Sequence, residues 1–371
     1  LGVDPTRRSL TGTGGYVKVG RKGNAKWNFS ETFTWSSPGF DLNDMGYMKE
    51  TDYLMNETEI MYRQTDIWKI FRYNAFTLSQ KNMWNYGGTP FSNNASLRWQ
   101  SMTMNRYEWD VKETFAWNWL DSRLLRGGPD VRFGSYFLTS AKFNTDKAKR
   151  MMFMLKYEGD HNFEGNRFNT ISPSLTFRLG NHVYLSGQLD YAWNTDEMQY
   201  VATTSPLSSS SLAPYYYVMG HMDQKTYGLT LKLQVNVTPD ISIQFYGAPF
   251  TSIAKYDDFK LAADTKSHTF ENRFQRIDPD QLTYADGVYT IGEGAGQMPF
   301  RNPDFRFNEF RSNLVARWEY LPGSTLYFVW EHRMSNRDNW YSSGWGSNLD
   351  RMWGLPATNT FMIKMNYWFN L

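Results

Sequence analysis

The last eleven residues of the chain, Phe361-Met-Ile-Lys-Met-Asn-Tyr-Trp-Phe-Asn-Leu371, are the most informative about its fold. Apolar side chains occupy every second position from Phe361 to Leu371, and Lys364 and Asn366 stand between them. A period of two is that of a β-strand with one apolar and one polar face. A terminus of this kind is typical of outer-membrane barrels, where the last strand pairs with the first and the apolar face meets lipid. An edge strand of a soluble sandwich is the alternative.

The same alternation recurs along the chain. In Tyr227–Val237 the odd positions are mostly apolar and the even positions polar, a pattern that a helix would scatter around its circumference. Val183–Tyr191 and residues 313–320 repeat the pattern. Residues 168–179 follow it too, with Pro173 predicting a bulge or an irregular strand. We therefore expect an all-β chain built from hairpins.

The predicted connections alternate in length. Short turns are expected near residues 20–24, 64–67, 105–108, 144–147, 179–182, 238–240 and 321–325. Long connections are expected near residues 37–50, 81–93, 121–129, 159–166, 194–224, 255–304 and 334–357. Outer-membrane barrels sort their connections in this way, with short periplasmic turns and long extracellular loops. We predict a transmembrane antiparallel β-barrel of about 14–16 strands over residues 1–371, located in the cell outer membrane.

The direction of the strands bears on how much of the barrel is present. If the chain ends on the periplasmic side, counting back gives roughly fifteen spanning strands, whereas single-chain bacterial barrels use an even number. We therefore expect at least one strand upstream of Leu1, and we expect the sequence to be the C-terminal part of a longer protein.

Composition agrees with a barrel and excludes other classes. The 371 residues include 15 Trp, 24 Tyr and 26 Phe, which would supply aromatic girdles at two membrane interfaces. The mean hydropathy of −0.61 suits a barrel, because half of each strand faces water. No run approaches the roughly 18 apolar residues of a membrane helix, which excludes a helical membrane protein. The net charge of +2 offers no footprint for nucleic acid.

Several strands are expected to place charged or polar side chains on the inner wall. The candidate lumen-lining residues are Lys156, Arg178, Asp190, Lys232, Gln234, Arg317, Glu319, Glu331 and Lys364. Their mixed signs on neighbouring strands predict pairing across the lumen, whereas a ring of one sign would select ions.

Two segments break the pattern. Glu31 shares a face with Trp27 and Phe29, and Glu113 shares a face with Phe115. A carboxylate in lipid costs on the order of 2 kcal/mol. These faces are therefore expected to point into the lumen or at a plug or partner, unless a bulge shifts the register. A lumen lined by aromatic rings and carboxylates would suit sugars.

Two long loops carry candidate ligand residues. In the loop 334–357, aromatic rings stand beside guanidinium groups, a combination that suits a carbohydrate or a protein partner, or rings that pack on themselves. These residues are Trp340, Tyr341, Trp345, Trp353, Arg337 and Arg351. In the loop 255–304, Asp278, Asp280 and Asp286 are candidate Ca²⁺ ligands, although their spacing is not that of an EF-hand and a solvated turn is the simpler interpretation. No other cofactor is expected.

The sequence offers little for catalysis. The five His residues form no His-x-x-x-His or Glu-x-x-His pair, and no Gly-x-Ser-x-Gly nucleophile motif is present. We therefore expect that the protein is not an enzyme.

Four blocks of sequence resemble a family of Gram-negative outer-membrane proteins: Arg8–Tyr16, Ser37–Met48, Leu125–Pro129 and Phe310–Trp330. Members of that family join an N-terminal family-nine-like carbohydrate-binding module to a C-terminal barrel that is a domain of unknown function. The resemblance covers nearly the whole chain and implies an outer-membrane barrel. It supplies no catalytic residues, and the binding module is missing from this sequence.

Two functions remain open at this stage. The first is an outer-membrane barrel for passage or capture of a small solute, glycan-derived solutes included. The second is a non-transporting scaffold that docks lipoproteins or other outer-membrane proteins through its large loops. Both imply outer-membrane lipid as a partner.

Overall fold

The computed structural model describes residues 9–42, 46, 48, 50–117, 119–207, 214–339 and 345–369. Its main feature is a sixteen-stranded antiparallel sheet, in which the strands follow one another in chain order and the short β15 pairs with β14 at one end. The other strands of this sheet are β1 (Gly14–Arg21), β2 (Trp27–Ser36), β3 (Tyr53–Gln64), β4 (Phe71–Trp84), β5 (Pro90–Thr103), β6 (Glu108–Trp117), β9 (Tyr136–Asn144), β10 (Met151–Asn162), β11 (Arg167–Leu179), β12 (Val183–Thr204), β13 (Tyr216–Asn236), β14 (Ile241–Ala262), β19 (Phe305–Leu321), β20 (Ser324–Asp338) and β21 (Thr358–Asn366).

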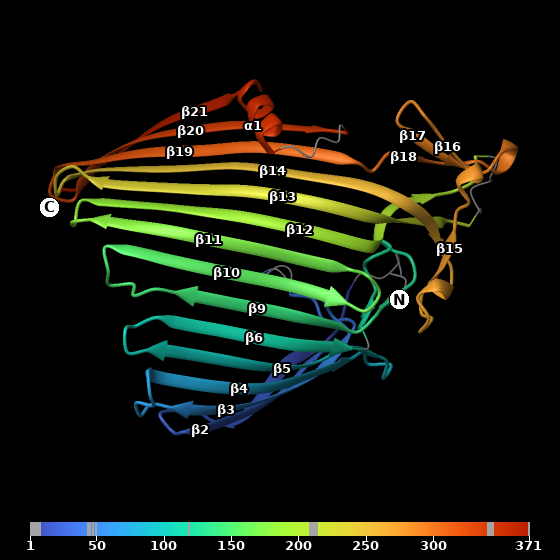
Figure 1. Ribbon diagram of the computed structural model, residues 1–371, viewed down its shortest axis with the longest axis horizontal. Helices are drawn as coiled ribbons and strands as arrows, with labels where there is room; N and C mark the ends of the chain where they lie inside the picture. The colour runs from blue at the N-terminus through green and yellow to red at the C-terminus, as the bar shows by residue number, and fades with distance from the viewer. Residues whose placement is uncertain are drawn as a thin grey trace.

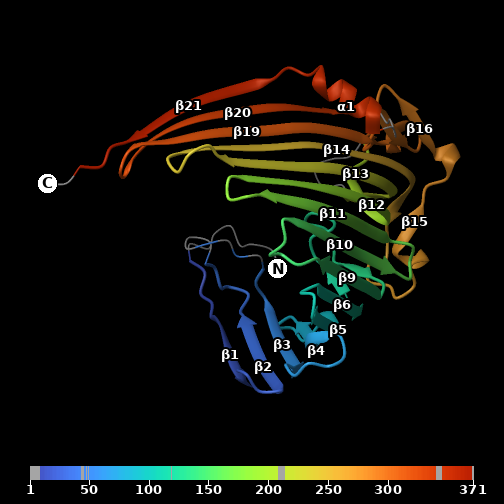
Figure 2. The same cartoon turned by 60° about the vertical axis from the view of Figure 1, so that its left-hand side comes forward.

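The sheet curls into an open trough, with the short turns at one end and the long connections at the other (Figures 1 and 2). The predicted all-β class and antiparallel pairing are confirmed. The predicted closure is not present within the described residues, because β1 pairs only with β2 and β21 only with β20. Strand direction gives the physical reason. Fifteen strands that alternate in direction leave β1 and β21 running the same way, so direct pairing would be parallel.

Side chains of opposite character cover the two faces of the sheet. Register partners share a face, so a row of partners can be followed from strand to strand. One such row consists of Leu185, Leu233, Phe245, Leu314, Trp330 and Phe361. Its members are partly or largely open to solvent, up to 64% for Phe361. We call the face that carries this row the convex face.

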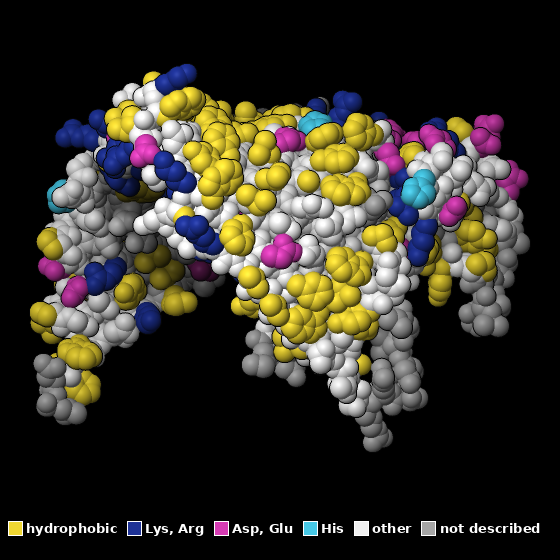
Figure 3. Space-filling view, turned by 90° about the horizontal axis from the view of Figure 1, so that it is seen from below, with side chains coloured by type: hydrophobic (Ala, Val, Ile, Leu, Met, Phe, Trp, Pro, Cys, Tyr) yellow, Lys and Arg dark blue, Asp and Glu magenta, His cyan; other side chains and the backbone are white. Residues whose placement is uncertain are grey.

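The opposite, concave face carries small polar side chains. A row of register partners there consists of Ser30, Glu59, Ser79, Ser96 and Thr114. Ser30, Ser96 and Thr114 are only 4–7% exposed, although they are polar. Seen from the side on which β2–β5 lie, hydrophobic side chains gather in broad patches with few charged ones among them (Figure 3). The usual arrangement of a water-soluble protein is therefore inverted in the sheet.

The total accessible area expresses the same inversion. It is 23153 Å², whereas a compact globular chain of 43.5 kDa would expose about 15,000 Å². The excess comes from a sheet that has solvent on both faces.

A second region, the cap, lies at the end with the long connections. It consists of the far ends of β12–β14, the hairpin β7 (Trp119–Asp121) and β8 (Val131–Phe133), and the segment 263–304. That segment contains β15 (Phe274–Arg276) and a separate three-stranded sheet of β16 (Leu282–Ala285), β17 (Val288–Ile291) and β18 (Met298–Arg301), joined by 3₁₀ turns at Glu271–Arg273, Pro279–Gln281 and Gly294–Gly296.

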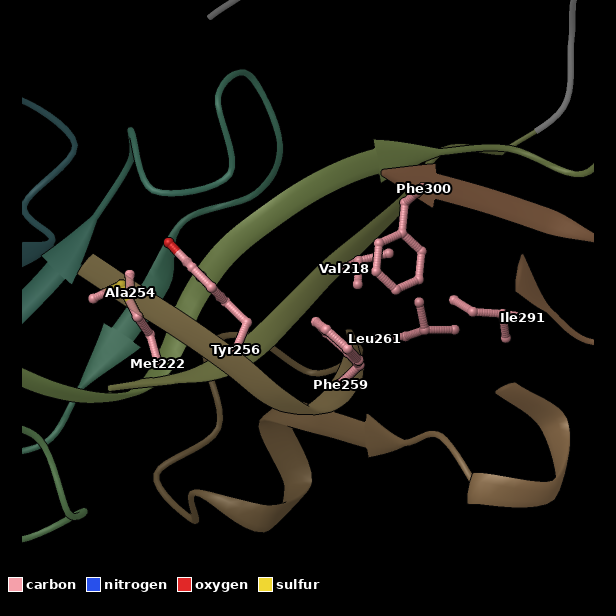
Figure 4. Close-up of a cluster of buried hydrophobic side chains, with 8 residues drawn as sticks. All are labelled: Val218, Met222, Ala254, Tyr256, Phe259, Leu261, Ile291 and Phe300. Atoms are coloured by element: carbon pink, nitrogen blue, oxygen red, sulfur yellow. The ribbon is translucent and has the colours of Figure 1, made fainter. Parts of the chain in front are cut away.

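The cap has conventional apolar cores. Figure 4 shows one of them, in which Val218 and Leu261 from the long strands meet Ile291 and Phe300 from β17 and β18. A second core joins Leu125 and Val131 to Met198, Met219 and Phe274. The apolar positions of the long strands are thus exposed in the trough and buried in the cap.

The observed connections differ from the predicted loops in four ranges. The range 81–93 is mostly strand, and its turn covers only residues 85–89, where Gly88 adopts a φ of 80°. The ranges 194–224 and 255–304 begin as continuations of β12 and β14, which extend beyond the trough with register shifts in their pairing. The range 334–357 contains the helix α1 (Trp345–Trp353). Among the described residues, no helix has the length and apolar character to cross a membrane.

Candidate functional site

The concave face carries all nine residues that the sequence proposed for a lumen. Lys156 is the register partner of Ser172, whose hydroxyl donates to Asp190 at 2.6 Å. Further rows on the same face link Arg178 to Gln234, Lys232 to Glu331, and Arg317 to Lys364, while Glu319 follows Arg317 by two positions on β19. The face therefore presents charges of both signs.

These charges pair locally along or between adjacent strands. Arg98 binds Asp110 through Nε at 2.8 Å and through Nη2, Lys156 binds Glu158 at 2.8 Å, and Arg317 binds Glu319. The predicted pairing of mixed signs is present, but it runs between neighbours rather than across the trough.

Glu31 and Glu113 lie on the convex face, which corrects the prediction that they face the lumen. Glu113 is the register partner of the exposed Leu97, and Glu31 shares its face with Phe29. The register runs without a shift through the middle of these strands, so no bulge turns either carboxylate inward. Both carboxylates are hydrogen-bonded on this face, since Glu31 accepts from Asn56 and Thr58 and Glu113 accepts from Thr139 at 2.7 Å.

A cavity of about 730 Å³ lies on the concave face where β4 and β5 approach the cap. We call it the mouth pocket. Its floor is formed by two pairs of register partners, Lys81 with Asn94 and Met83 with Ser92. Its walls come from residues 50–52, from the 85–89 turn and from residues 119–123 beside β7. The aromatic rings in the lining are Tyr86, Phe91 and Trp119.

The polar groups of the mouth pocket differ in how far they are already engaged. Glu50 faces Arg123 at 4.0 Å, and Asp130 binds Lys266 of the cap at 2.7 Å. Asp121 accepts from the backbone N–H groups of Arg123 and Leu124 and so holds the wall in shape. By contrast, neither Lys81 nor Asn94 has a side-chain hydrogen bond or ion pair within the described residues.

A buried ion pair fastens the cap to a neighbouring loop. The Arg273 guanidinium is 1% exposed and binds both carboxylate oxygens of Glu164, at 2.8 and 2.9 Å. It also donates to the carbonyl oxygens of Arg132, Ser267 and His268. One side chain therefore joins three segments that are far apart in the sequence.

His221 lies in the cap part of β13, with Nδ1 3.1 Å from Glu197 and Nε2 3.6 Å from Asp223. Burial disfavours its charged form, but the hydrogen bond and charge of Glu197, together with the charges of Asp223 and Asp257, outweigh burial and raise the pKa of His221. Burial also raises the pKa of the nearby Asp196 carboxyl.

The candidate ligand residues of the loop 334–357 are only partly brought together. Trp340 and Tyr341 lie outside the described residues, as does the side chain of Trp345 in α1. Trp353 contacts Phe310 with ring centroids 4.9 Å apart, and the Arg337 guanidinium lies 5.1 Å from the Phe305 ring. Arg351 stands in the last turn of α1. The helix thus packs on the sheet, and the structure shows no shared platform of these side chains in its described part.

The acidic candidates for Ca²⁺ are spread along the β16–β17 hairpin. Asp278 precedes a 3₁₀ turn that contains Asp280, and Asp286 stands at a φ of 49° in the hairpin turn. Among the described residues, no three His, Asp or Glu side chains gather closely enough to hold a metal ion. The predicted triad is therefore not brought together.

Comparison with known protein families gives one match. Residues 4–371 match the family described as a domain of unknown function, DUF5916. The chain belongs to this family. The sequence resemblance to a family of unknown function is thus confirmed in its coarse form, and the match says nothing of a carbohydrate-binding module or an outer membrane. Neither the curated proteins nor the solved structures gave a significant match.

Sequence reasoning missed the mouth pocket. Its lining comes from five segments between residues 38 and 130, and no local motif links them. The one available signal was Lys81 on β4, a cation at a position that the alternating pattern places on the polar face, opposite the polar Asn94.

Proposed function

We propose that the trough is the wall of an outer-membrane β-barrel and that its concave face serves the passage or capture of a small polar solute. The inverted faces of the sheet carry this proposal. Apolar rows on the convex face suit the hydrocarbon of a bilayer, and the charged concave face suits a watery interior.

The lengths of the strands fit the same proposal. A tilted strand crosses a bilayer with about 9–11 residues, and β2, β6 and β21 have 10, 10 and 9 residues. The strands β12–β14 have 21 or 22 residues, so about half of each would stand outside the membrane, where the cap buries their apolar side chains.

The open edges set a condition on the proposal. Unpaired backbone groups in lipid cost several kcal/mol each, so β1 and β21 must both be hydrogen-bonded there. Because β1 and β21 run in the same direction, antiparallel closure requires an odd number of further strands between them.

Reconstitution tests the proposal. The purified protein, incorporated into vesicles of Gram-negative phospholipids, should admit small sugars and should conduct ions in planar bilayers. Brominated acyl chains should quench its tryptophan fluorescence, because Trp109, Trp318 and Trp330 lie on the convex face. A chain that stays folded and monomeric in buffer without detergent would overturn the proposal.

A second candidate function is a docking scaffold for lipoproteins or other barrels. The separate sheet of β16–β18, which lies beyond the trough and packs on the far ends of β13 and β14, favours it (Figure 1). Replacing residues 279–301 by a Gly/Ser linker separates the two functions. A scaffold would lose a subunit that co-purifies in fixed stoichiometry, whereas a solute pathway would keep its conductance.

A further inference from the structure

We infer that the mouth pocket is a binding site for a neutral oligosaccharide. The inference deepens the proposed function and rests on it, because it assigns a site and a solute class to the concave face. The pocket is a place on that face where a solute would meet walls on several sides before it entered the trough.

The size of the pocket excludes very small solutes as its best occupants. Sites for small molecules usually measure about 300–1,000 Å³ and enclose most of the ligand surface. The mouth pocket, at about 730 Å³, falls within this range and is much larger than a single inorganic ion requires. A ligand with several linked rings fits it.

The free polar groups in the pocket suit hydroxyl groups. The Lys81 ammonium can donate, the Asn94 amide can donate and accept, and the Ser92 hydroxyl can do both. These three side chains project from adjacent positions on β4 and β5, so they form one polar strip on the floor. A polyhydroxylated ligand can satisfy all three at once, whereas an apolar ligand would leave them unpaired.

Aromatic side chains supply the second requirement of a sugar site. Tyr86 and Trp119 stand in the walls beside the polar strip. Their rings offer apolar faces to the C–H surfaces of a pyranose while their N–H and O–H groups remain available for hydrogen bonds. Polar strip and rings together match a ligand that is polar at its edge and apolar on its face.

Charge selects a neutral sugar over an acidic one. The lining contains four carboxylates, Glu50, Asp52, Asp121 and Asp130, and two cations, Lys81 and Arg123. Lys266 pairs with Asp130 and Arg123 with Glu50, which leaves Asp52 and Asp121 against Lys81. The remaining balance is negative, so an anionic sugar would be repelled.

The test measures binding to the folded protein in detergent micelles by isothermal titration calorimetry. The neutral probes are maltotriose, cellotriose, xylotriose and N,N′,N″-triacetylchitotriose, and the anionic probe is trigalacturonic acid. At least one neutral probe should bind, and trigalacturonic acid should bind more weakly. If none of the four neutral probes binds, or if trigalacturonic acid binds best, the inference is wrong.

Matched variants locate the site. Lys81→Met and Asn94→Leu should each weaken binding of the neutral probe by about tenfold, the effect of losing one good hydrogen bond from an enclosed site. Lys232→Met is the control, because Lys232 lies on the same concave face outside the pocket. Equal affinities for Lys81→Met and Lys232→Met would place the ligand elsewhere and reject the pocket.

The outcomes separate this inference from the proposed function. Calorimetry in micelles measures binding without passage through a membrane. If the protein conducts ions but binds none of the sugars, the sugar site is rejected and the barrel is not. A protein that binds a neutral sugar but stays folded and monomeric without detergent rejects the barrel alone.

Discussion

The trough and the cap use the same alternating strands in opposite environments. In β13, Leu231 of the trough is 40% exposed, whereas Val218 and Met219 of the cap are fully buried. The cap buries its apolar side chains against β17, β18 and the 119–133 segment, as a water-soluble protein does. The trough turns its apolar side chains outward and has small polar side chains inside. The difference indicates that the two regions are built for different solvents, and under our proposal these are lipid and water.

The largest expected effect tests the attachment of the cap. Arg273→Ala removes one partner of a buried ion pair and leaves Glu164 uncompensated, which should cost the cap about 3–5 kcal/mol. Hydrogen exchange and limited proteolysis should show loss of protection over residues 263–276, with the trough strands unchanged.

Arg276→Ala is the matched control for this prediction. Arg276 lies three residues further along and its side chain is 78% exposed, so its loss should change protection little. Equal effects of the two variants would mean that the bonds of Arg273 do not hold the cap.

The next effect tests the environment of the convex face. Leu231→Arg should lower the free energy of unfolding in lipid by about 2–4 kcal/mol, the cost of a cation near the middle of a bilayer. The same change at an exposed position in water would cost less than about 0.5 kcal/mol. Urea unfolding from vesicles, followed by tryptophan fluorescence, measures the difference.

Gln234→Arg provides the comparison on the other face. Gln234 lies three positions from Leu231 on the same strand and projects from the concave side. A penalty of equal size for both variants would contradict a lipid-facing convex side, and no penalty for either would contradict it as well.

The sequence predicts a feature of the trough or the cap only where the residues that determine it are close together in the chain. The alternation in Tyr227–Val237 is a local property, so the trough part of β13 was predicted from sequence. The cap was not, because β13 carries buried apolar residues on both faces there, Met219 on one and Met222 on the other, and the partners that bury these residues lie tens of residues away. Local pattern shows that a strand exists, but it does not show what covers its apolar face.

The orientation of Glu31 and Glu113 is a second feature that the local sequence pattern did not predict. Because a lipid-facing carboxylate is costly, Glu31 and Glu113 were expected to face the lumen, a plug or a partner, unless a bulge shifted the register. Only the register traced through successive strands reveals that they lie on the convex side. The helix α1 has only a weak signal in the local sequence. Among the α1 side chains that the structure describes, Asn348 and Met352, four positions apart, are buried, but nothing near them in the sequence predicts a helix.

A smaller change in stability is expected at Glu113, which interrupts the apolar side chains of the convex face. Glu113→Leu should raise the free energy of unfolding in lipid by about 1 kcal/mol, because it removes a carboxylate from an apolar row. Lys112→Leu, at the next position on the concave face, should give no such gain. Urea unfolding from vesicles compares the two, and a loss of stability in Glu113→Leu would indicate that this position does not face lipid and that its hydrogen bond with Thr139 outweighs any gain.

The smallest expected effect is a pH dependence of the stability of the cap. Under our proposal the cap lies in water, where its titratable groups can exchange protons with the solvent. The pKa of His221 is raised in the folded protein, so its charged form stabilises the cap below the ordinary histidine pKa. That contribution is lost as the pH rises through the folded pKa. Between about pH 6 and pH 8.5, corrected hydrogen-exchange protection of residues 218–222 should therefore fall, by about 0.5 kcal/mol for a pair that is partly open to solvent.

His221→Gln should flatten this dependence, whereas His182→Gln, beside a short turn at the far end of the sheet, should preserve it. A pH dependence that persists in His221→Gln would assign it to the neighbouring carboxylates, among which the buried Asp196 is the nearest alternative with a raised pKa.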